Sequence, residues 1–291
     1  MSDTTITSTF NFNVNKLPLK GPNGQATPLY GLFRDDTNEV VVNQAVSSLY
    51  VPHTVEDVIS LRDAAAEAFD GIEDTKTQCY FKRGHQVVFQ PTRQARIEAC
   101  QNDTVFPRII ISANYNRAFT ASLGFYRDLC TNLTILRQVQ GITVNIRHTS
   151  GLRHHMDELI SDFRNLSSGL SNLEEVIHDL ESRKVRMADF VRAVFGAPPE
   201  EAGVGQTLAV RRIEAIFSRL NRERRATGQR EVSESDDFTC SAWSAFQAVQ
   251  GYLQHDTNRR GSNVTPQSRI FTTLSDSRVA RAERAAFELS L

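Results

Sequence analysis

The stretch AFTASLGFY, residues 118–126, decides the fold class because apolar side chains recur at every second position. This period of two places the odd-numbered residues from Phe119 to Phe125 on one face of a β-strand and polar or small residues on the other. Residues 142–147 repeat the alternation, with isoleucine and valine on the apolar face. Strands with one wet face predict a mainly antiparallel, twisted sheet in the middle of the chain.

The sequence before this stretch predicts more strands and one helix. Strand-forming runs at residues 86–90 and 108–112 are bounded by glycine or proline. Residues 29–43 hold an Asp-Asp-Thr-Asn turn between two apolar runs, which predicts a β-hairpin. Thr54, followed by acidic residues, predicts the start of a helix whose positive end favours acidic side chains. Residues 1–26 are rich in Thr, Asn and Ser and are predicted to form a mobile arm.

The sequence after residue 151 changes to a period of three or four, which is typical of amphipathic helices. Helical segments are expected at about residues 156–195, 205–227, 243–252 and 276–289. The apolar residues expected on the buried faces of the first two segments include Met187, Phe190, Val191 and Val194, and Leu208, Ile213, Ile216, Phe217 and Leu220. This order predicts an α+β fold with an N-terminal and central sheet, one early helix and a C-terminal helical part. We expect the helical part to pack on the sheet as one domain, with these regions: a flexible arm (1–26), a basic and aromatic sheet region (27–151) and a helical region (152–291).

Composition excludes several classes of protein. The four cysteines are far apart and lack a C-x-x-C pair, which argues against a zinc site and a disulfide framework. No run approaches the roughly 18 apolar residues of a membrane span, and the N-terminus lacks the pattern of a signal peptide. We therefore expect a cytoplasmic protein with reduced thiols and no contact with a membrane.

Charge is segregated along the chain, although the formal net charge is only −1. Residues 76–155, called the central basic segment below, contain 11 basic and 3 acidic residues. The flanking residues 34–75 contain 2 basic and 10 acidic residues, and residues 156–207 contain 5 basic and 10 acidic residues. A second basic block, residues 208–230, contains 7 basic and 2 acidic residues. Basic stripes of this size are the usual electrostatic footprint of a polyanion site.

Aromatic residues are interleaved with the basic ones in the central basic segment. Arginine offers forked donors to phosphate oxygens, and rings on a sheet face stack on bases, so this combination suits single-stranded nucleic acid. We expect phosphate contacts from Lys82, Arg83, Arg93, Arg96, Arg117, Arg127, Arg147 and Arg153. We expect base stacking by Tyr80, Tyr115 or Tyr126. An alternative stays open, in which the arginines pair with acidic helices of the same chain or of a neighbouring subunit while the rings fill the core.

Two further clusters are candidates for binding. The run RHTSGLRHH, residues 147–155, joins a predicted strand to a helix N-terminus, where backbone N–H groups favour an anion. His154, His155 and Asp157 are a weaker candidate for a metal site, because no further ligand has recognisable spacing. The helix predicted at 205–227 ends in arginines that either complement the negative end of its dipole or form a secondary surface for nucleic acid or a partner. These arginines are Arg219, Arg222, Arg224, Arg225 and Arg230.

Catalytic signatures are absent from the sequence. The glycine-containing run AGVGQT, residues 202–207, lacks the lysine of a phosphate-binding loop. The chain has neither a G-x-S-x-G elbow nor an H-E-x-x-H motif. The acidic pair Asp35-Asp36 falls in a predicted turn, where aspartate is common for backbone reasons. We therefore expect a protein that is not an enzyme, with no catalytic residues, no metal and no cofactor.

A series of short motifs runs in order over roughly residues 30–270. The motifs are Asp35-Asp36-Thr37, Tyr50-Val51-Pro52, Arg83-Gly84-His85, Ile111-Ser112-Ala113-Asn114, Leu129-Cys130-Thr131-Asn132, Ile146-Arg147-His148-Thr149 and Ala248-Val249-Gln250-Gly251-Tyr252-Leu253-Gln254-His255. Together they resemble the phage/plasmid-like proteins known as domain of unknown function 932. This chain has Asn116-Arg117 where that family tends to have an Asp-Gly turn, which adds a positive charge.

The resemblance implies a mobile-element protein of the host cytoplasm and no enzyme class. By its order of strands and helices the chain is also similar, more distantly, to ring-forming single-strand annealing proteins of phages. Those proteins bind single strands on a basic groove that runs around an oligomer.

Three function hypotheses follow. The first is a phage or plasmid protein that binds single-stranded DNA or RNA, with a homo-oligomeric DNA annealing or recombination factor as one form of it. The second is a non-enzymatic interaction protein that inhibits a host defence or replication factor by docking through acidic helices. The third and weakest is a metal-dependent nuclease that uses His154, His155 and Asp157. The sequence leaves open the oligomeric state, the choice between DNA and RNA, and the host pathway.

Overall fold

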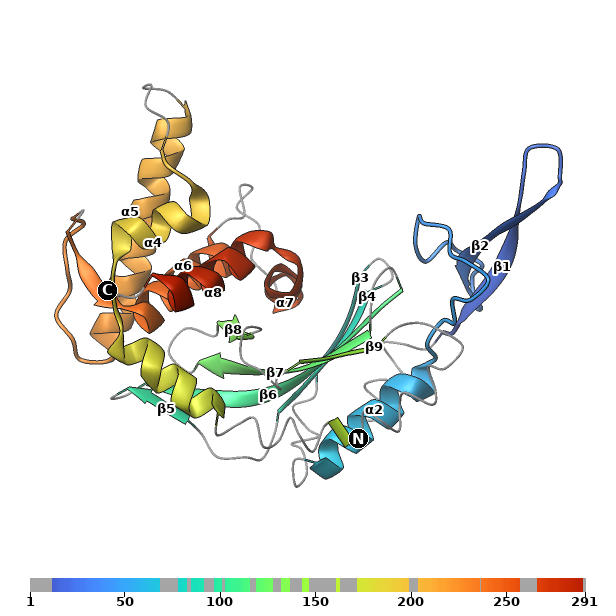
Figure 1. Ribbon diagram of the computed structural model, residues 1–291, viewed down its shortest axis with the longest axis horizontal. Helices are drawn as coiled ribbons and strands as arrows, with labels where there is room; N and C mark the ends of the chain where they lie inside the picture. Colours follow the sequence, from blue (N-terminus) through green and yellow to red (C-terminus); the bar gives the residue numbers. More distant parts are fainter. Residues whose placement is uncertain are drawn as a thin grey trace. The chain divides into compact units, whose positions relative to one another are not determined.

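Strands and one helix come first along the chain and helices follow, so the predicted α+β class is confirmed (Figure 1). The computed structural model describes residues 12–68, 78–82, 85–91, 97–100, 103–115, 119–127, 132–136, 143–146, 161–162, 172–198, 204–235, 237–256 and 266–289. The strands are β1 (Val14–Lys20), β2 (Ala26–Arg34), β3 (Gln78–Lys82), β4 (His85–Pro91), β5 (Ile97–Cys100), β6 (Asp103–Asn114), β7 (Phe119–Arg127), β8 (Leu133–Thr134), β9 (Thr143–Ile146), β10 (Lys184–Arg186) and β11 (Thr239–Ser241). The helices are α2 (Val55–Ala68), a helix over residues 172–182, α4 (Met187–Phe195), α5 (Val204–Ala226), α6 (Ala242–His255), α7 (Pro266–Ser275) and α8 (Ser277–Glu288).

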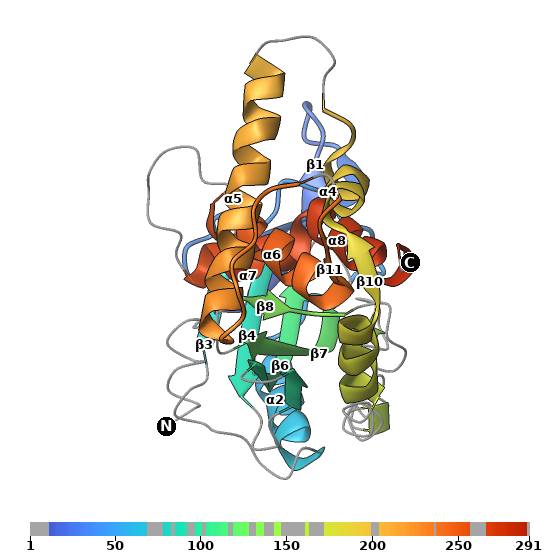
Figure 2. The same cartoon turned by 90° about the vertical axis from the view of Figure 1, so that its left-hand side faces the viewer.

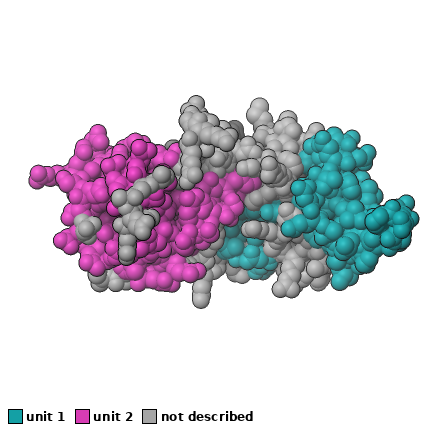
Figure 3. Space-filling model, turned by 90° about the horizontal axis from the view of Figure 1, so that it is seen from above, with its two compact units in different colours: residues 1–95, 107–124, 140–169 teal, residues 96–106, 125–139, 170–291 magenta. Residues whose placement is uncertain are grey.

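Two compact units make up the chain, and each is assembled from separate stretches of sequence (Figure 3). Unit 1 consists of residues 1–95, 107–124 and 140–169. Unit 2 consists of residues 96–106, 125–139 and 170–291. The compact units therefore do not follow the division into a sheet region and a helical region that the sequence suggested. Strand-rich stretches from the middle of the chain belong to the same unit as the C-terminal helices.

The N-terminal part of unit 1 is a two-stranded antiparallel sheet of β1 and β2, in which Val14 pairs with Arg34 and Lys20 with Ala26. The prediction of a mobile arm is wrong for residues 14–20, because they form β1 and Val14 is buried in the core. The predicted hairpin of residues 29–33 and 39–43 forms in part, because the N–H of Val41 donates to the Leu32 carbonyl at 2.9 Å. Strand β2 pairs with β1, and the chain after the Asp35 turn contributes an isolated bridge between Phe33 and Val40.

Helix α2 begins where the sequence predicted, directly after Thr54. The hydroxyl of Thr54 accepts a hydrogen bond from the backbone N–H of Asp57 at 3.1 Å. The carboxylate of Asp57 in turn accepts one from the backbone N–H of Thr54 at 2.8 Å. This reciprocal cap satisfies two N–H groups that the first turn of a helix cannot pair internally.

The central strands form an antiparallel sheet with the order β3-β4-β6-β7-β8, in which β5 pairs with β6 and β9 pairs with β7. The predicted alternation is visible in the register of β7 and β9, because Ala121 lies opposite Val144, whereas Thr120 lies opposite Asn145. Isoleucines in the middle of β6 are fully buried, which fixes this strand in the core.

The helices of unit 2 pack in pairs, α5 with α6, α6 with α8 and α4 with α8 (Figures 1 and 2). Helix α4 buries the apolar side chains that its spacing predicted and ends at Gly196, which has a φ of 84°. Helix α5 buries Ile216, Phe217 and Leu220 as predicted, but Leu208 is 40% exposed. Helix α6 is the most buried helix described, with Trp243 and Phe246 fully enclosed.

None of the helices in the described ranges combines the length and the apolar character needed to cross a membrane.

Candidate nucleic-acid interface

Two of the predicted contact residues, Arg127 and Tyr115, have side chains within the described part of the chain. Both are buried, with 3% and 1% of their surface exposed. The remaining predicted contacts lie outside the described side chains. Tyr80 and Lys82 belong to β3 and Tyr126 to β7, with only their backbone described. Entirely outside the described residues are Arg83, Arg93, Arg96, Arg117, Arg147 and Arg153.

Arg127 holds two buried carboxylates together in unit 2. Its Nε donates to both oxygens of Asp103, at 2.7 and 2.8 Å, and its Nη1 donates to the carboxylate of Glu223 on α5. The indole Nε1 of Trp243 also donates to Asp103, at 3.1 Å. Asp103 is completely buried, and a buried carboxylate without a cation is strongly destabilising. The prediction that Arg127 contacts phosphates is therefore wrong for this conformation, because internal carboxylates use its charge.

Burial raises the pKa of Glu223, and the positive charge of Arg127 opposes that rise. A raised carboxyl pKa is the usual result when an acid leaves water. The ion pair is thus a compromise between desolvation of Glu223 and attraction to Arg127. Its geometry links Arg127, the last residue of β7, to the last turn of α5, and the two paired residues lie 96 positions apart in sequence.

Tyr115 is a core residue of unit 1 and does not present its ring for base stacking. Its ring stacks on the imidazole of His53, with 4.0 Å between the ring centroids. Its backbone carbonyl accepts a hydrogen bond from the hydroxyl of Tyr50 at 2.9 Å. The ring belongs to the same apolar cluster as Phe12 and Leu32. The prediction of Tyr115 as a stacking residue is wrong because the N-terminal strands cover it.

Several carboxylates of the two acidic blocks are paired with arginines close to them in sequence. Asp36 pairs with Arg34, Asp63 with Arg62, Asp179 with Arg183 and Asp189 with Arg186. Pairs of this kind on the surface contribute little to stability, about 0–1 kcal/mol each. They nevertheless neutralise these carboxylates from within their own blocks.

The arginines of α5 divide into buried and exposed groups. Arg219 is buried and donates to the carboxylate of Asp256, with Nη2 at 2.8 Å from Oδ1. Arg211, Arg222 and Arg225, called the α5 arginine face below, are exposed. Their spacing of 11 and 3 residues places them on one side of the helix, since three turns take about 11 residues. Two exposed acidic residues lie beside this face: Glu214 on the same helix, and Glu231, which pairs with Arg225 at 2.9 Å.

The chain after α5 folds back over the last turns of that helix. The side-chain amide of Asn221 donates to the carbonyl of Val232 at 2.8 Å, and its oxygen accepts from the N–H of Val232 at 2.8 Å. Arg224 Nε donates to the carbonyl of Arg230 at 2.7 Å. Gly228, with a φ of 77°, makes the reversal without steric cost. Arg230 is exposed and is thereby held near the end of α5.

A buried polar network that the sequence analysis missed joins α6 to β8. Gln250 accepts from the Thr134 hydroxyl at 2.6 Å and donates to the Leu133 carbonyl at 3.0 Å. Gln254 donates to the same carbonyl at 2.7 Å and accepts from the Leu133 N–H at 3.1 Å. The signal was the presence of Gln247, Gln250 and Gln254 at helical spacing on an otherwise apolar helix face.

Two of the recognised motifs meet in this network. Asn132, from the Leu-Cys-Thr-Asn motif, donates to the Gln247 carbonyl at 3.0 Å and lies 3.1 Å from Nε2 of His255. A methyl group on Gly251 would lie 3.3 Å from the Asn132 amide and 3.1 Å from Cδ of Arg219. The glycine therefore lets these side chains approach α6 closely. These motif residues support the fold of unit 2.

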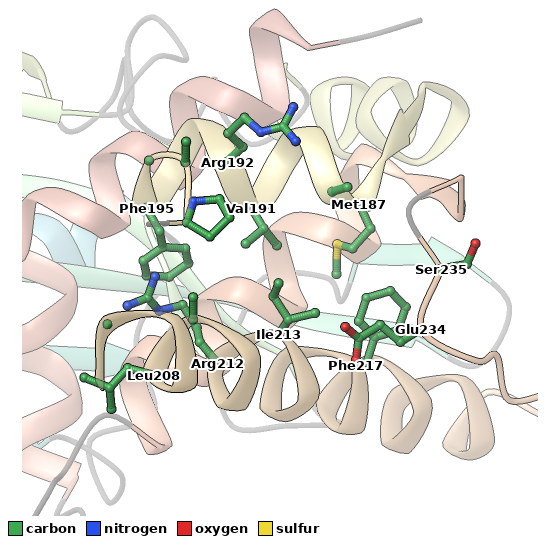
Figure 4. Close-up of a pocket in the computed structure, with 16 residues that line it drawn as sticks. Met187, Val191, Arg192, Phe195, Leu208, Arg212, Ile213, Phe217, Glu234 and Ser235 are labelled. Carbon is green, nitrogen blue, oxygen red and sulfur yellow. The ribbon is translucent and has the colours of Figure 1, made fainter. Parts of the chain in front are cut away.

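A pocket lies between α4 and α5 in unit 2, with a volume of about 390 Å³ (Figure 4). Apolar side chains of both helices line most of it, including Val191, Ile213 and Phe217. Arg212 lies beside Phe195, with its guanidinium carbon 4.4 Å from the ring centroid. The pocket is on a different side of α5 from the α5 arginine face, because Arg211 and Arg212 differ by about 100° around the helix.

No metal cluster is formed by three or more His, Cys, Asp or Glu side chains within the described ranges. His154, His155 and Asp157, the residues of the metal hypothesis, lie outside those ranges. A model of the family described as "Domain of unknown function (DUF932)" matches residues 42–284. Neither a curated protein nor a solved structure matches the chain.

Proposed function

The chain belongs to the DUF932 family, a domain of unknown function, and from its charge distribution we propose that it binds single-stranded nucleic acid. The proposed role is binding without catalysis, in a phage or plasmid protein that works in the host cytoplasm. Annealing or recombination of DNA by a homo-oligomer is the form of this role that the resemblance in strand and helix order supports. Binding is expected to depend on phosphates rather than on base sequence.

The observation that carries the proposal is the charge that remains outside the core in residues 208–230. This block has 7 basic and 2 acidic residues. One residue of each sign is buried: Arg219, which pairs with Asp256, and Glu223, which pairs with Arg127. Six arginines and one glutamate remain outside the core. Burial thus leaves the positive excess of this block unchanged, and the pair between Arg225 and Glu231, which lies just outside the block, offsets one of its charges. The remaining excess can attract an external polyanion.

The central basic segment supports the proposal by the same reasoning. Arg127 and Asp103, which neutralise each other in the core, take one charge of each sign from its 11 basic and 3 acidic residues. Ten basic and two acidic residues remain, so the excess is unchanged.

The first test is binding of a fluorescently labelled single-stranded oligonucleotide, measured by anisotropy in about 50 mM and about 200 mM salt. We expect saturable binding at the lower salt concentration that weakens steeply at the higher one, because phosphate contacts release counterions. A duplex of the same sequence is expected to bind more weakly. The absence of binding at the lower salt concentration would contradict the proposal.

A second measurement separates the proposal from the interaction-protein hypothesis. Tagged protein is used to capture partners from host lysate before and after nuclease treatment. We expect capture to depend on nucleic acid. Capture of one host protein that survives nuclease treatment, together with no binding of the oligonucleotide, would favour the inhibitor of a host factor instead.

A further inference from the structure

The pocket between α4 and α5 is not used by the proposed function, and its size suits a small ligand. Its volume of about 390 Å³ falls within the roughly 300–1,000 Å³ of pockets that bind organic molecules. Its apolar wall consists mainly of Met187, Val191, Phe195, Leu208, Ile213 and Phe217. Such a lining favours an aliphatic group, because each buried CH₂ contributes about 0.8 kcal/mol.

The polar side chains of the pocket are not spread evenly. Figure 4 shows Arg212 beside Phe195 at one end, whereas Glu234 and Ser235 lie near Phe217 at the other. The Arg212 guanidinium carbon is 4.4 Å from the centroid of the Phe195 ring. This cation–π contact occupies the face of the guanidinium and leaves its N–H edges for an anion. The charges therefore favour a negative group at the Arg212 end.

Arg192 adds a second positive charge to the lining. Its Nη1 lies 3.4 Å from Asp189, but that carboxylate is already paired with Arg186 at 2.6 Å. One carboxylate thus faces two arginines, Arg186 at the end of β10 and Arg192 on α4, and a net positive charge remains near the pocket.

From these features we propose that the pocket binds an aliphatic chain that ends in a single carboxylate. The carboxylate accepts hydrogen bonds from Arg212, and the chain lies along Val191, Ile213 and Phe217. The proposal does not depend on nucleic-acid binding, because the α5 arginine face is on another side of the helix.

The test is isothermal titration of the full-length protein with decanoate and, separately, with its uncharged analogue 1-decanol. We expect one saturable site for decanoate and clearly weaker binding of the alcohol. Arg212→Gln removes the charge but keeps a polar side chain, and we expect it to weaken decanoate about tenfold. The same substitution is expected to leave the weak binding of the alcohol unchanged.

The adjacent arginine provides a matched control. Arg211 is on the same helix and exposed, but it is not part of the lining, so Arg211→Gln is expected to leave decanoate binding unchanged. Ala188→Phe fills part of the pocket from α4 and is expected to abolish binding. Its folding is checked by circular dichroism, and the Arg212→Gln result stands independently if this variant does not fold.

Several results would overturn the proposal. The first is a titration with decanoate that shows no saturable binding. The second is equal affinity for decanoate and 1-decanol. The third is an equal loss of decanoate affinity in Arg211→Gln and Arg212→Gln. A pocket reserved for the side chains of a partner protein would give the first of these results. Failure of nucleic-acid binding is read separately, by anisotropy of the labelled oligonucleotide, and does not affect this outcome.

Discussion

Arg127 on β7 and Arg222 on α5 both come from strongly basic blocks of the sequence, yet their environments are opposite. Arg127 is 3% exposed and neutralises Asp103 and Glu223, whereas Arg222 is exposed on the α5 arginine face. The difference shows that the net charge of a segment gives the size of a positive excess but not its location. A buried carboxylate requires a nearby cation, and the arginine that supplies it is lost to external ligands.

The largest expected effect is the loss of stability when Arg127 is replaced. Arg127→Met leaves Asp103 and Glu223 buried without their cation, which we expect to lower the free energy of unfolding by about 3–5 kcal/mol. The measurement is urea denaturation monitored by circular dichroism. Arg222→Met is the matched control and is expected to change stability by no more than about 0.5 kcal/mol.

The comparison between the two arginines would break if Arg127→Met were as stable as the wild type. It would also break if that variant lost oligonucleotide binding while keeping its full stability. The first result would mean that the buried ion pair does not stabilise the fold, and the second that Arg127 is available to ligands in solution.

A smaller loss is expected in the glutamine network of α6. Gln254→Met keeps a similar side-chain volume but removes the acceptor of the buried Leu133 N–H. Each unsatisfied buried group costs about 1–3 kcal/mol, so we expect a loss in that range. Gln206→Met, at an exposed position of α5, is the control and is expected to be neutral. Equal stability of the two variants would show that the network does not form.

The smallest effect concerns pH and Glu181, which is half-buried in the helix over residues 172–182. Burial raises the pKa of its carboxyl above the ordinary value of 4.5, although the Ser241 hydroxyl that donates to it opposes this. A raised pKa means that the folded state binds the proton more tightly than the unfolded state. The stabilising contribution is therefore complete below pH 4.5 and is lost as the pH rises through the folded-state value.

Glu181→Gln is expected to remove this dependence. Urea denaturation of both proteins at several pH values between about 4 and 7 measures it. We expect the stability of the wild type relative to the variant to fall as pH rises through this range. A wild type that gains stability relative to the variant over the same range would contradict the assigned direction.

Local patterns predicted much of the fold. The helical spacing of Met187, Phe190, Val191 and Val194 predicted the buried face of α4, and Thr54 predicted the start of α2. Strand β1 was missed because its residues are mostly exposed and only Val14 is buried along it. Its pairing depends on β2, and composition alone does not show that the two strands meet.

The candidate site was harder to predict because burial depends on contacts distant in sequence. Arg127 was predicted as a phosphate contact because the residues next to it in sequence do not indicate that it pairs with Glu223, which lies 96 residues later. Tyr115 was predicted to stack on bases, but its ring stacks on His53, which lies 62 residues earlier in the chain, and it packs in the core with residues of the N-terminal strands. The glutamines of α6 look solvent-exposed by residue type, and only the position of β8 explains their burial.

The most direct test of the central claim is the salt dependence of oligonucleotide binding by a variant of the α5 arginine face. Arg211, Arg222 and Arg225 are changed together to glutamine, and Arg281→Gln with Arg284→Gln, two exposed positions on α8, forms the control. We expect the triple variant to bind more weakly and its plot of log affinity against log salt to be shallower by about 2, since each phosphate contact contributes about 0.7 for single strands. The control is expected to keep the wild-type slope. A triple variant with wild-type affinity and slope would contradict the claim that the exposed arginines of α5 bind nucleic acid.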